Sequence, residues 1–211
     1  MLDARARYIY IRDELMAENY FEIESNQYVL EETKESGKTK LDVIVNKENI
    51  CIANFDEKKR CGFFKDGSTS GMKKCSDHIV FIRNGDSWKI CIIEMKTTVN
   101  GDTWRAVKQK VRASFLNCLA IAAVLGLPIV ETETEVYTTY EHEKFGVNKP
   151  KLGERYTDLK KDEWDKHRIP VHIAGDYNND YDAGRIYFKH TAYKLERDLD
   201  TNQLEGVLVL S

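Results

Sequence analysis

Residues 74–96 read KCSDHIVFIRNGDSWKICIIEMK, a pattern that predicts two β-strands joined by a tight turn. Apolar runs at 78–82 and 88–93 supply the strands. Between them the residues NGD at 84–86 supply turn chemistry, and Asn-Gly between apolar runs is a strong short-range hairpin signal. We therefore expect an antiparallel hairpin here.

Charged residues stand at the open end of this hairpin. Asp77 precedes the first apolar run and Glu94 ends the second, so antiparallel pairing brings the two carboxylates to one place. Side chains two apart on a strand share a face, so Glu94 and Lys96 project to one side and Met95 to the other. Two close carboxylates favour an oxygen-ligated divalent cation, Mg²⁺ or Mn²⁺, and an adjacent ammonium can position or activate a bound water.

A simpler interpretation is an ordinary salt bridge at a strand end. Charged residues make up 32% of the chain, so a Glu-x-Lys tripeptide alone carries little information. Glu94, however, ends a run at 90–93 that is apolar on both faces, which is typical of a central strand. Charges at the end of a buried strand favour a functional site over the salt bridge.

The order of these residues resembles the PD-(D/E)xK nuclease superfamily, which has the restriction-endonuclease-like fold. Ser76 stands where the proline that names the motif would be. The resemblance covers roughly the first two thirds of the chain. It implies a Mg²⁺- or Mn²⁺-dependent nuclease in which Asp77 and Glu94 hold the metal and the carbonyl of Met95 is a further ligand. Lys96 would orient or activate the attacking water.

Residues 103–125 predict a long amphipathic helix. Apolar residues recur at spacings of three and four from Trp104 to Ala122, and Gly126 follows the last turn. The opposite side carries four basic residues, Arg105, Lys108, Lys110 and Arg112, which we expect to track a phosphate backbone.

Gln109 lies among these basic residues. In several branches of the superfamily a Gln on this helix points to the catalytic centre, often within Gln-x-x-x-Tyr, so the resemblance implies an accessory role for Gln109. Here Ala113 occupies the tyrosine position. The alternative is that Gln109 is one more polar surface residue.

A second basic cluster precedes Asp77. It comprises Lys58, Lys59, Arg60, Lys65, Lys73 and Lys74. The net charge is only −3, so distribution matters more than the sum, and positive charge on both sequence flanks of an acidic centre suits phosphate binding. A solvated loop remains the alternative.

The order of predicted elements gives an α/β (α+β) fold with a restriction-endonuclease-like core, a mixed β-sheet flanked by helices. A helix at 2–21, with Ala6, Ile9, Leu15 and Met16 as core positions, is followed by strands at 27–33, 41–46 and 49–55. After the hairpin and the long helix, a strand at 135–140 should run parallel to the second hairpin strand, because a helix connects them. We assign residues 1–142 to the nuclease-like core.

Residues 143–211 are expected to form a β-containing extension packed on the same domain. A short helix at 159–164 and strands at 169–174 and 185–190 are predicted, and the apolar tail 207–210 suggests a docked edge strand or one that faces a partner. The acidic segment 175–182 is similar to a calcium loop but lacks its turn glycine and its bidentate glutamate, so we expect a hairpin turn.

Composition agrees with one sizeable core: the chain has 211 residues, 42% of them apolar. No apolar run approaches eighteen residues and the N-terminus is not signal-like, so no membrane association and a cytoplasmic location are expected. The five cysteines, an odd number without metal-type spacing, should be free and mostly buried thiols.

The expected function is hydrolysis of phosphodiester bonds, in DNA more than RNA, in a bacterial defence, restriction or repair system. The sequence leaves open whether the protein forms a homo-oligomer or part of a larger complex. One alternative is a non-catalytic module on a nuclease-like fold that binds nucleic acid or protein. Another is a structural subunit of a larger machine. The intact Asp77, Glu94 and Lys96 favour the enzyme.

Overall fold

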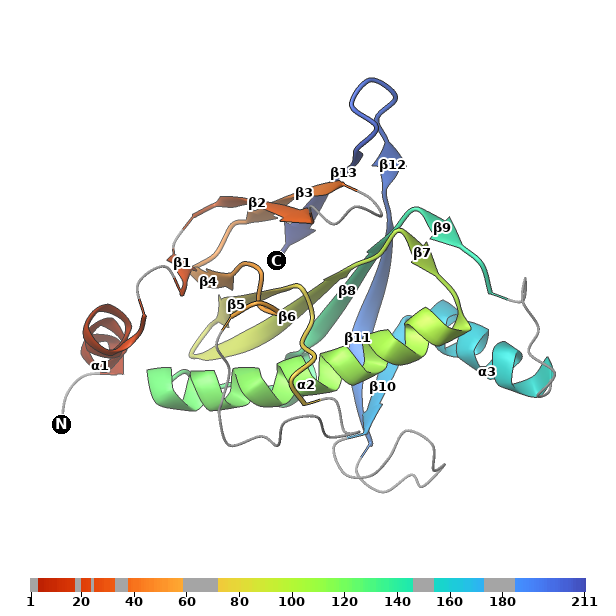
Figure 1. Cartoon of the computed structure of the whole chain (residues 1–211). Coiled ribbons are helices and arrows are strands. Elements are labelled where there is room, and N and C mark those ends of the chain that lie inside the picture. The colour runs from red at the N-terminus through yellow and green to blue at the C-terminus, as the bar shows by residue number, and fades with distance from the viewer. Residues whose placement is uncertain are drawn as a thin grey trace.

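Three layers make up the fold: the long helix α2 (Gly101–Leu125), a seven-stranded sheet and a four-stranded sheet (Figure 1). The computed structural model describes residues 4–17, 20–23, 25–32, 38–58, 72–145, 154–172 and 185–211. One apolar cluster packs between α2 and the larger sheet, and a second packs between the two sheets. The chain is therefore a mixed α/β protein of the α+β type.

The larger sheet has the strand order β1-β4-β5-β6-β8-β11-β10. Its strands are β1 (Glu22–Ile23), β4 (Asn49–Ile52), β5 (His78–Asn84), β6 (Ser87–Met95), β8 (Glu135–Tyr140), β10 (Arg168–His172) and β11 (Arg185–Lys194). β6 pairs with β8 in parallel, and β8 pairs with β11 in parallel, whereas the other pairs are antiparallel. The predicted parallel pairing of the strand at 135–140 is confirmed.

The predicted hairpin is formed by β5 and β6. Asn84 pairs with Ser87 at the turn, and Gly85 has a φ of 63°, the left-handed conformation that favours glycine. At the other end His78 pairs with Ile93. β6 is buried from Trp88 to Met95, so it is the central strand that its apolar run predicted.

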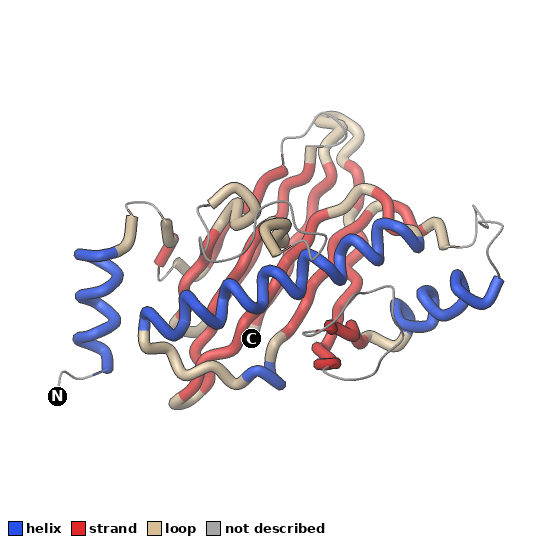
Figure 2. The backbone as a smooth tube through the Cα atoms, turned by 60° about the horizontal axis from the view of Figure 1, so that its bottom comes forward, coloured by secondary structure: helices blue, strands red, loops and turns tan. Residues whose placement is uncertain are grey.

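The whole of helix α2 lies across one face of the larger sheet (Figure 2). Asn100 caps it: its side-chain oxygen accepts the N–H groups of Asp102 and Thr103, and the Thr103 hydroxyl accepts the N–H of Asn100. Gly126, with a φ of 75°, ends it. The predicted helix at 103–125 is confirmed and begins two residues earlier.

The smaller sheet has the order β12-β13-β3-β2. Its strands are β2 (Gln27–Glu32), β3 (Thr39–Val45), β12 (Glu196–Arg197) and β13 (Leu204–Leu210). β13 pairs in parallel with β3 and lies between β3 and β12, so the tail strand is docked but is not an edge strand. Leu204, Leu208 and Leu210 are buried while Val207 and Val209 face outward, because alternate residues point to opposite faces.

The N-terminal helix departs from the prediction. Helix α1 (Ala4–Tyr10) continues into a π-helical turn, Ile11–Leu15, that ends in the bond from Met16 N–H to Ile11 O. Tyr8 and Ile11 are the buried positions. The predicted core positions Ala6, Ile9 and Leu15 are exposed, and only Met16 packs against the core. The wider π turn accounts for Leu15 and Met16, because it brings Met16, five residues after Ile11, to the buried face in place of Leu15.

The C-terminal segments complete the layers. Helix α3 (Glu154–Asp165) is longer than the predicted 159–164, and β7 (Thr98–Val99) pairs with β9 (His142–Glu143) beside it. β11 pairs with β8, and β13 pairs with β3. Each of the two sheets therefore contains strands from residues 1–142 and strands from residues 143–211. The acidic segment 175–182 lies outside the described residues.

Four cysteines, Cys51, Cys75, Cys91 and Cys118, are buried thiols outside any disulfide, as predicted, and Cys61 lies outside the described residues. Within the part of the chain that the structure describes, no helix is both long enough and apolar enough to cross a membrane.

Candidate functional site

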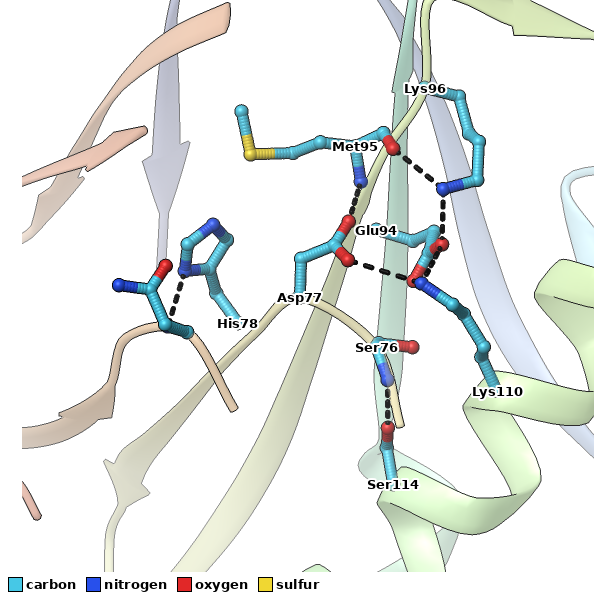
Figure 3. Close-up of polar contacts among 9 residues, drawn as sticks. Ser76, Asp77, His78, Glu94, Met95, Lys96, Lys110 and Ser114 are labelled. Atoms are coloured by element: carbon cyan, nitrogen blue, oxygen red, sulfur yellow. Dashed lines mark hydrogen bonds and ion pairs between the residues drawn. The ribbon is translucent and has the colours of Figure 1, made fainter. Parts of the chain in front are cut away.

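Two carboxylates and two lysines meet where β5 begins and β6 ends, beside α2 (Figure 3). Asp77 directly precedes β5, Glu94 is on β6, and Lys96 directly follows β6. Lys110 reaches the same point from α2. The hairpin thus brings Asp77, Glu94 and Lys96 together, as their positions in the sequence predicted.

Asp77 is held by the main chain of its neighbours. Its Oδ2 accepts the N–H of Met95 at 2.7 Å, and its main-chain oxygen accepts the N–H of Phe55 at 2.6 Å. Its other carboxylate oxygen, Oδ1, lies 3.1 Å from Lys110 Nζ. With 5% of its surface exposed, Asp77 is nearly buried, so its carboxylate position is well defined.

Glu94 is fully buried, although its side chain ends in an ionisable carboxyl group. Its Oε1 forms ion pairs with Lys96 Nζ at 2.5 Å and with Lys110 Nζ at 2.7 Å, although neither contact has ordinary hydrogen-bond geometry. Its Oε2 has no hydrogen-bond partner among the described residues. A buried carboxylate oxygen without a partner is costly, which is typical of a site that takes a ligand.

Lys96 joins the side chain of Glu94 to the main chain of Met95. Its Nζ donates to the Met95 carbonyl at 2.8 Å while it contacts Glu94 Oε1. The Met95 side chain lies in the apolar cluster between the two sheets, on the other face of β6. The carboxylates, the Met95 carbonyl and the Lys96 ammonium therefore lie within one small region (Figure 3).

The surroundings shift the pKa values of the two acids in opposite directions. Burial by itself would raise the pKa of Asp77, but the charges of Lys96 and Lys110 and the Met95 N–H outweigh it, and the pKa of Asp77 is lowered. Burial, together with the negative charge of Asp77, raises the pKa of Glu94. Burial opposes the charge of Lys110, but Glu94 and Asp77 raise its pKa. Perturbed acids of this kind cluster at functional sites.

Lys110 is the site residue that sequence reasoning missed. The sequence placed it on an outward basic face of the helix, but its ammonium points to Asp77 and Glu94. Helical spacing gives only a partial signal: Lys110 lies three residues after Val107, a residue of the predicted apolar stripe, but the spacing does not fix its direction.

The predicted basic face is wrong in two further respects. Arg112 is buried, and Lys108 pairs with Glu163 of α3 at 2.6 Å. Gln109 is half-buried and, among the described residues, makes no hydrogen bond with Asp77, Glu94 or Lys96, so its accessory role stays a prediction. Of the basic cluster before Asp77, Lys59, Arg60 and Lys65 lie outside the described residues.

The segment before Asp77 is fastened to α2 by polar contacts. The N–H of Ser76 donates to Ser114 Oγ at 2.7 Å. Asn117 Nδ2 donates to the main-chain oxygen of Ala113 and contacts Cys75 Sγ. Ser76, in the place of the motif proline, therefore helps to fix Asp77 relative to Lys110.

A pocket of about 200 Å³ lies on the other side of Asp77, toward the smaller sheet. His78 lines it together with Asn54 and four further carboxylates, those of Glu31, Glu32, Asp56 and Glu57. His78 Nδ1 accepts the N–H of Asn54, and burial lowers the pKa of His78 to about 4, so its ring is neutral at pH 7 with the proton on Nε2. This side of the site is acidic, and the lysines are on the α2 side.

The residues fit a hard divalent cation that keeps part of its water. Within the described ranges, no three His, Cys, Asp or Glu side chains are arranged to hold a metal ion. Asp77, Glu94 and the Met95 carbonyl offer oxygen atoms only, and Mg²⁺ is usually bound through one or two carboxylates with water and phosphate oxygens as its other ligands. The unpartnered Oε2 of Glu94 is an open ligand position for such an ion.

Comparisons with protein-family models, with curated proteins and with solved structures found no match to this chain.

Proposed function

We propose that this protein is a metal-dependent nuclease that hydrolyses phosphodiester bonds, in DNA more than in RNA. The supporting observation is the meeting of Asp77 and Glu94, from adjacent strands, with two lysine ammonium groups at the end of a buried hairpin. The buried Oε2 of Glu94 adds to it: no described residue gives this oxygen a hydrogen bond, and a purely structural ion cluster gains nothing from an unsatisfied oxygen.

Asp77, Glu94 and the Met95 carbonyl would hold Mg²⁺ or Mn²⁺. When bound, such an ion supplies Lewis-acid stabilisation of the charge that develops on the phosphate, and it lowers the pKa of a coordinated water. Two carboxylates bring the charge that this requires, and the main-chain bonds of Asp77 hold its carboxylate in place before the cation arrives.

Lys96 has the role of orienting the attacking water. Its ammonium contacts Met95 O and Glu94 Oε1, two of the proposed ligand atoms, so a water beside these atoms is within its reach. An ammonium that is paired with a carboxylate donates hydrogen bonds and positive charge rather than accepting a proton. Lys96 therefore positions water and stabilises negative charge in the transition state.

The arrangement of elements supports a restriction-endonuclease-like core. An antiparallel hairpin carries the acids, and the helix α2 connects its second strand to the parallel strand β8. Carboxylates line the pocket beside His78 whereas Lys96 and Lys110 lie on the α2 side, so we expect the substrate to approach from the α2 side, where Gln109 is proposed to position a phosphate or a water. A cytoplasmic bacterial defence, restriction or repair system is the proposed setting.

A non-catalytic binding module is the second candidate, and one observation favours it. Lys110 neutralises both acids, and Lys108 is paired with Glu163, so several cations of the predicted phosphate-binding face are used within the protein. In this alternative the cluster stabilises the fold, and nucleic acid or a protein partner binds elsewhere.

Substitution of the acids separates the two candidates. We expect the wild type to cut plasmid, linear or single-stranded DNA with Mg²⁺ or Mn²⁺ and to be inactive in EDTA. Asp77→Asn and Glu94→Gln should lower the rate by at least ~10³-fold, because each removes a charged ligand while the fold persists. Circular dichroism and a thermal melt check the fold of each variant.

Glu135→Gln is a matched control. Glu135 is also a partly buried carboxylate on the same sheet, and it bridges two lysines, with contacts of 3.0 Å to Lys89 and 2.9 Å to Lys189. It stands at the start of β8, opposite Cys91 in the middle of β6, and its two lysine partners are not those of the site, so its loss should leave cleavage unchanged. Cleavage at wild-type rate by Asp77→Asn or Glu94→Gln would rule out the proposed site.

A further inference from the structure

Lys110 occupies the space between the two acids. Its Nζ lies 3.1 Å from Asp77 Oδ1 and 2.7 Å from Glu94 Oε1, so one ammonium bridges both carboxylates (Figure 3). Lys96 contacts only one of them, Glu94. A divalent cation shared by the two carboxylates, through Oε1 or Oε2 of Glu94, would have ligand bonds of ~2.1 Å and would have to lie between them as well. The two positive groups cannot occupy this space together.

The bridge also has a physical reason to form. Asp77 and Glu94 are both buried, and the Met95 N–H holds Asp77 in place, so the carboxylates cannot separate to relieve their repulsion. A counter-ion between them removes this cost, and a lysine beside the buried Val107 and Val111 can supply it from α2. The structure therefore carries its own cation at the point where the proposed metal ion would bind.

We infer that Lys110 is a built-in counter-ion of the Asp77–Glu94 pair, and that a divalent cation binds only by displacing its ammonium. This inference rests on the metal site of the proposed function. It adds that the two carboxylates are held in a charge-neutralised form before a divalent cation binds and that cation affinity is set by competition with a side chain. Lys110 is thus a positioning residue for the carboxylates and a determinant of cation affinity.

Competition of this kind lowers the apparent affinity for the divalent cation. The affinity is reduced in proportion to the fraction of molecules in which the Lys110 ammonium is away from the carboxylates. If the bridge forms in about nine molecules in ten, its removal strengthens cation binding about tenfold. Lys110→Met removes the ammonium and keeps most of the apolar stem, which packs along the helix.

The first measurement is Mn²⁺ binding to the full chain by titration calorimetry. We expect Lys110→Met to bind Mn²⁺ at least ~10-fold more tightly than the wild type. Lys108→Met is the matched control, since it removes the same charge from the same helix but from a lysine that contacts Glu163. Its Mn²⁺ affinity should stay within about twofold of the wild type, because its charge is more distant and screened.

The second measurement follows Lys110 in the wild type and does not depend on a variant that folds. Acetylation by an amine reagent, read by mass spectrometry, should be slow at Lys110 while its ammonium is ion-paired. Adding Ca²⁺ should speed acetylation of Lys110 several-fold and leave that of Lys108 unchanged.

The outcomes distinguish this inference from the proposed function. If Mn²⁺ binds the wild type and Lys110→Met equally, or if Ca²⁺ binds and Lys110 stays protected, the displacement inference is wrong while the metal site survives. If neither the wild type nor Lys110→Met binds Mn²⁺ or Ca²⁺, the metal site itself fails, and the proposed nuclease function fails with it.

Discussion

At the scale of single residues, Glu94 carries a carboxylate in a place that is unfavourable for a negative charge. It is fully buried on a central strand, and its neighbour Asp77 carries the same charge. Two lysines neutralise the pair, but Glu94 Oε2 has no hydrogen-bond partner within the described part of the chain. A core strand selected for stability alone would carry an apolar residue here, since well-packed apolar residues often match or exceed a buried ion pair.

A pH-dependent prediction concerns His190, a buried residue outside the site. Its Nε2 lies 3.0 Å from Thr138 Oγ1, and its ring packs on Trp104 and Trp164. Burial, with a smaller contribution from the charge of His167, lowers the pKa of His190 from 6.5 to about 3. Below pH 6.5 the unfolded chain therefore binds a proton that the folded chain does not, so this residue's contribution to stability is lost as the pH falls.

We expect the free energy of unfolding to fall by about 2 kcal/mol between pH 7 and pH 5 through His190, at about 1.4 kcal/mol for each unit below 6.5. His190→Gln should show a correspondingly smaller loss in urea denaturation at the two pH values. Equal pH dependence in His190→Gln and the wild type would contradict the pKa of about 3.

At the scale of elements, α2 determines whether the site is assembled. It carries Lys110, and through Ser114 it fixes the segment before Asp77. Its N-terminal end is set by Asn100, whose side chain accepts two N–H groups. The position of Lys110 thus depends on a cap ten residues away.

Asn100→Ala should lower the free energy of unfolding by ~1 kcal/mol, in the usual range for loss of an N-cap. Asn100→Gly should cost only a few tenths of a kcal/mol, because glycine at the cap leaves the N–H groups open to water. Urea denaturation measures both. A cost for Asn100→Ala no larger than for Asn100→Gly would show that the cap does not stabilise α2.

Elements with strong local signals could be predicted from the sequence. The hairpin followed from Asn84-Gly85 between apolar runs, and α2 followed from regular spacing that ends at Gly126. The meeting of Asp77, Glu94 and Lys96 could be predicted for the same reason, since it needs only the register of one hairpin.

Lys110 could not be placed in the same way. Its direction depends on how a helix packs against a sheet, which hairpin register does not determine. The exposed Leu15 was misplaced because the chain changes from an α-helical to a π-helical turn at Ile11–Leu15.

At the scale of the whole molecule, the long-range pairings escaped prediction. β13 joins β3 in parallel although more than 150 residues separate them, and no local pattern encodes that partner. The result is a second sheet on the far side of the larger one, so the hairpin strands β5 and β6 are covered on both faces. The site lies at the strand ends, with a carboxylate-lined pocket toward the smaller sheet and lysines toward α2.

The central claim is that this end of the sheet catalyses phosphodiester hydrolysis with a bound cation, and Lys96→Ala tests it most directly. DNA affinity is measured in Ca²⁺ and cleavage in Mg²⁺, with Lys166→Ala as a control because Lys166 is exposed and pairs with Asp162. We expect Lys96→Ala to lower the cleavage rate by ~10² to 10⁴-fold with little change in DNA affinity, since one contact is a small part of a many-contact interface. A wild-type protein that binds DNA equally with and without divalent ions and cuts nothing, with Lys96→Ala only weakening that binding, would contradict the account.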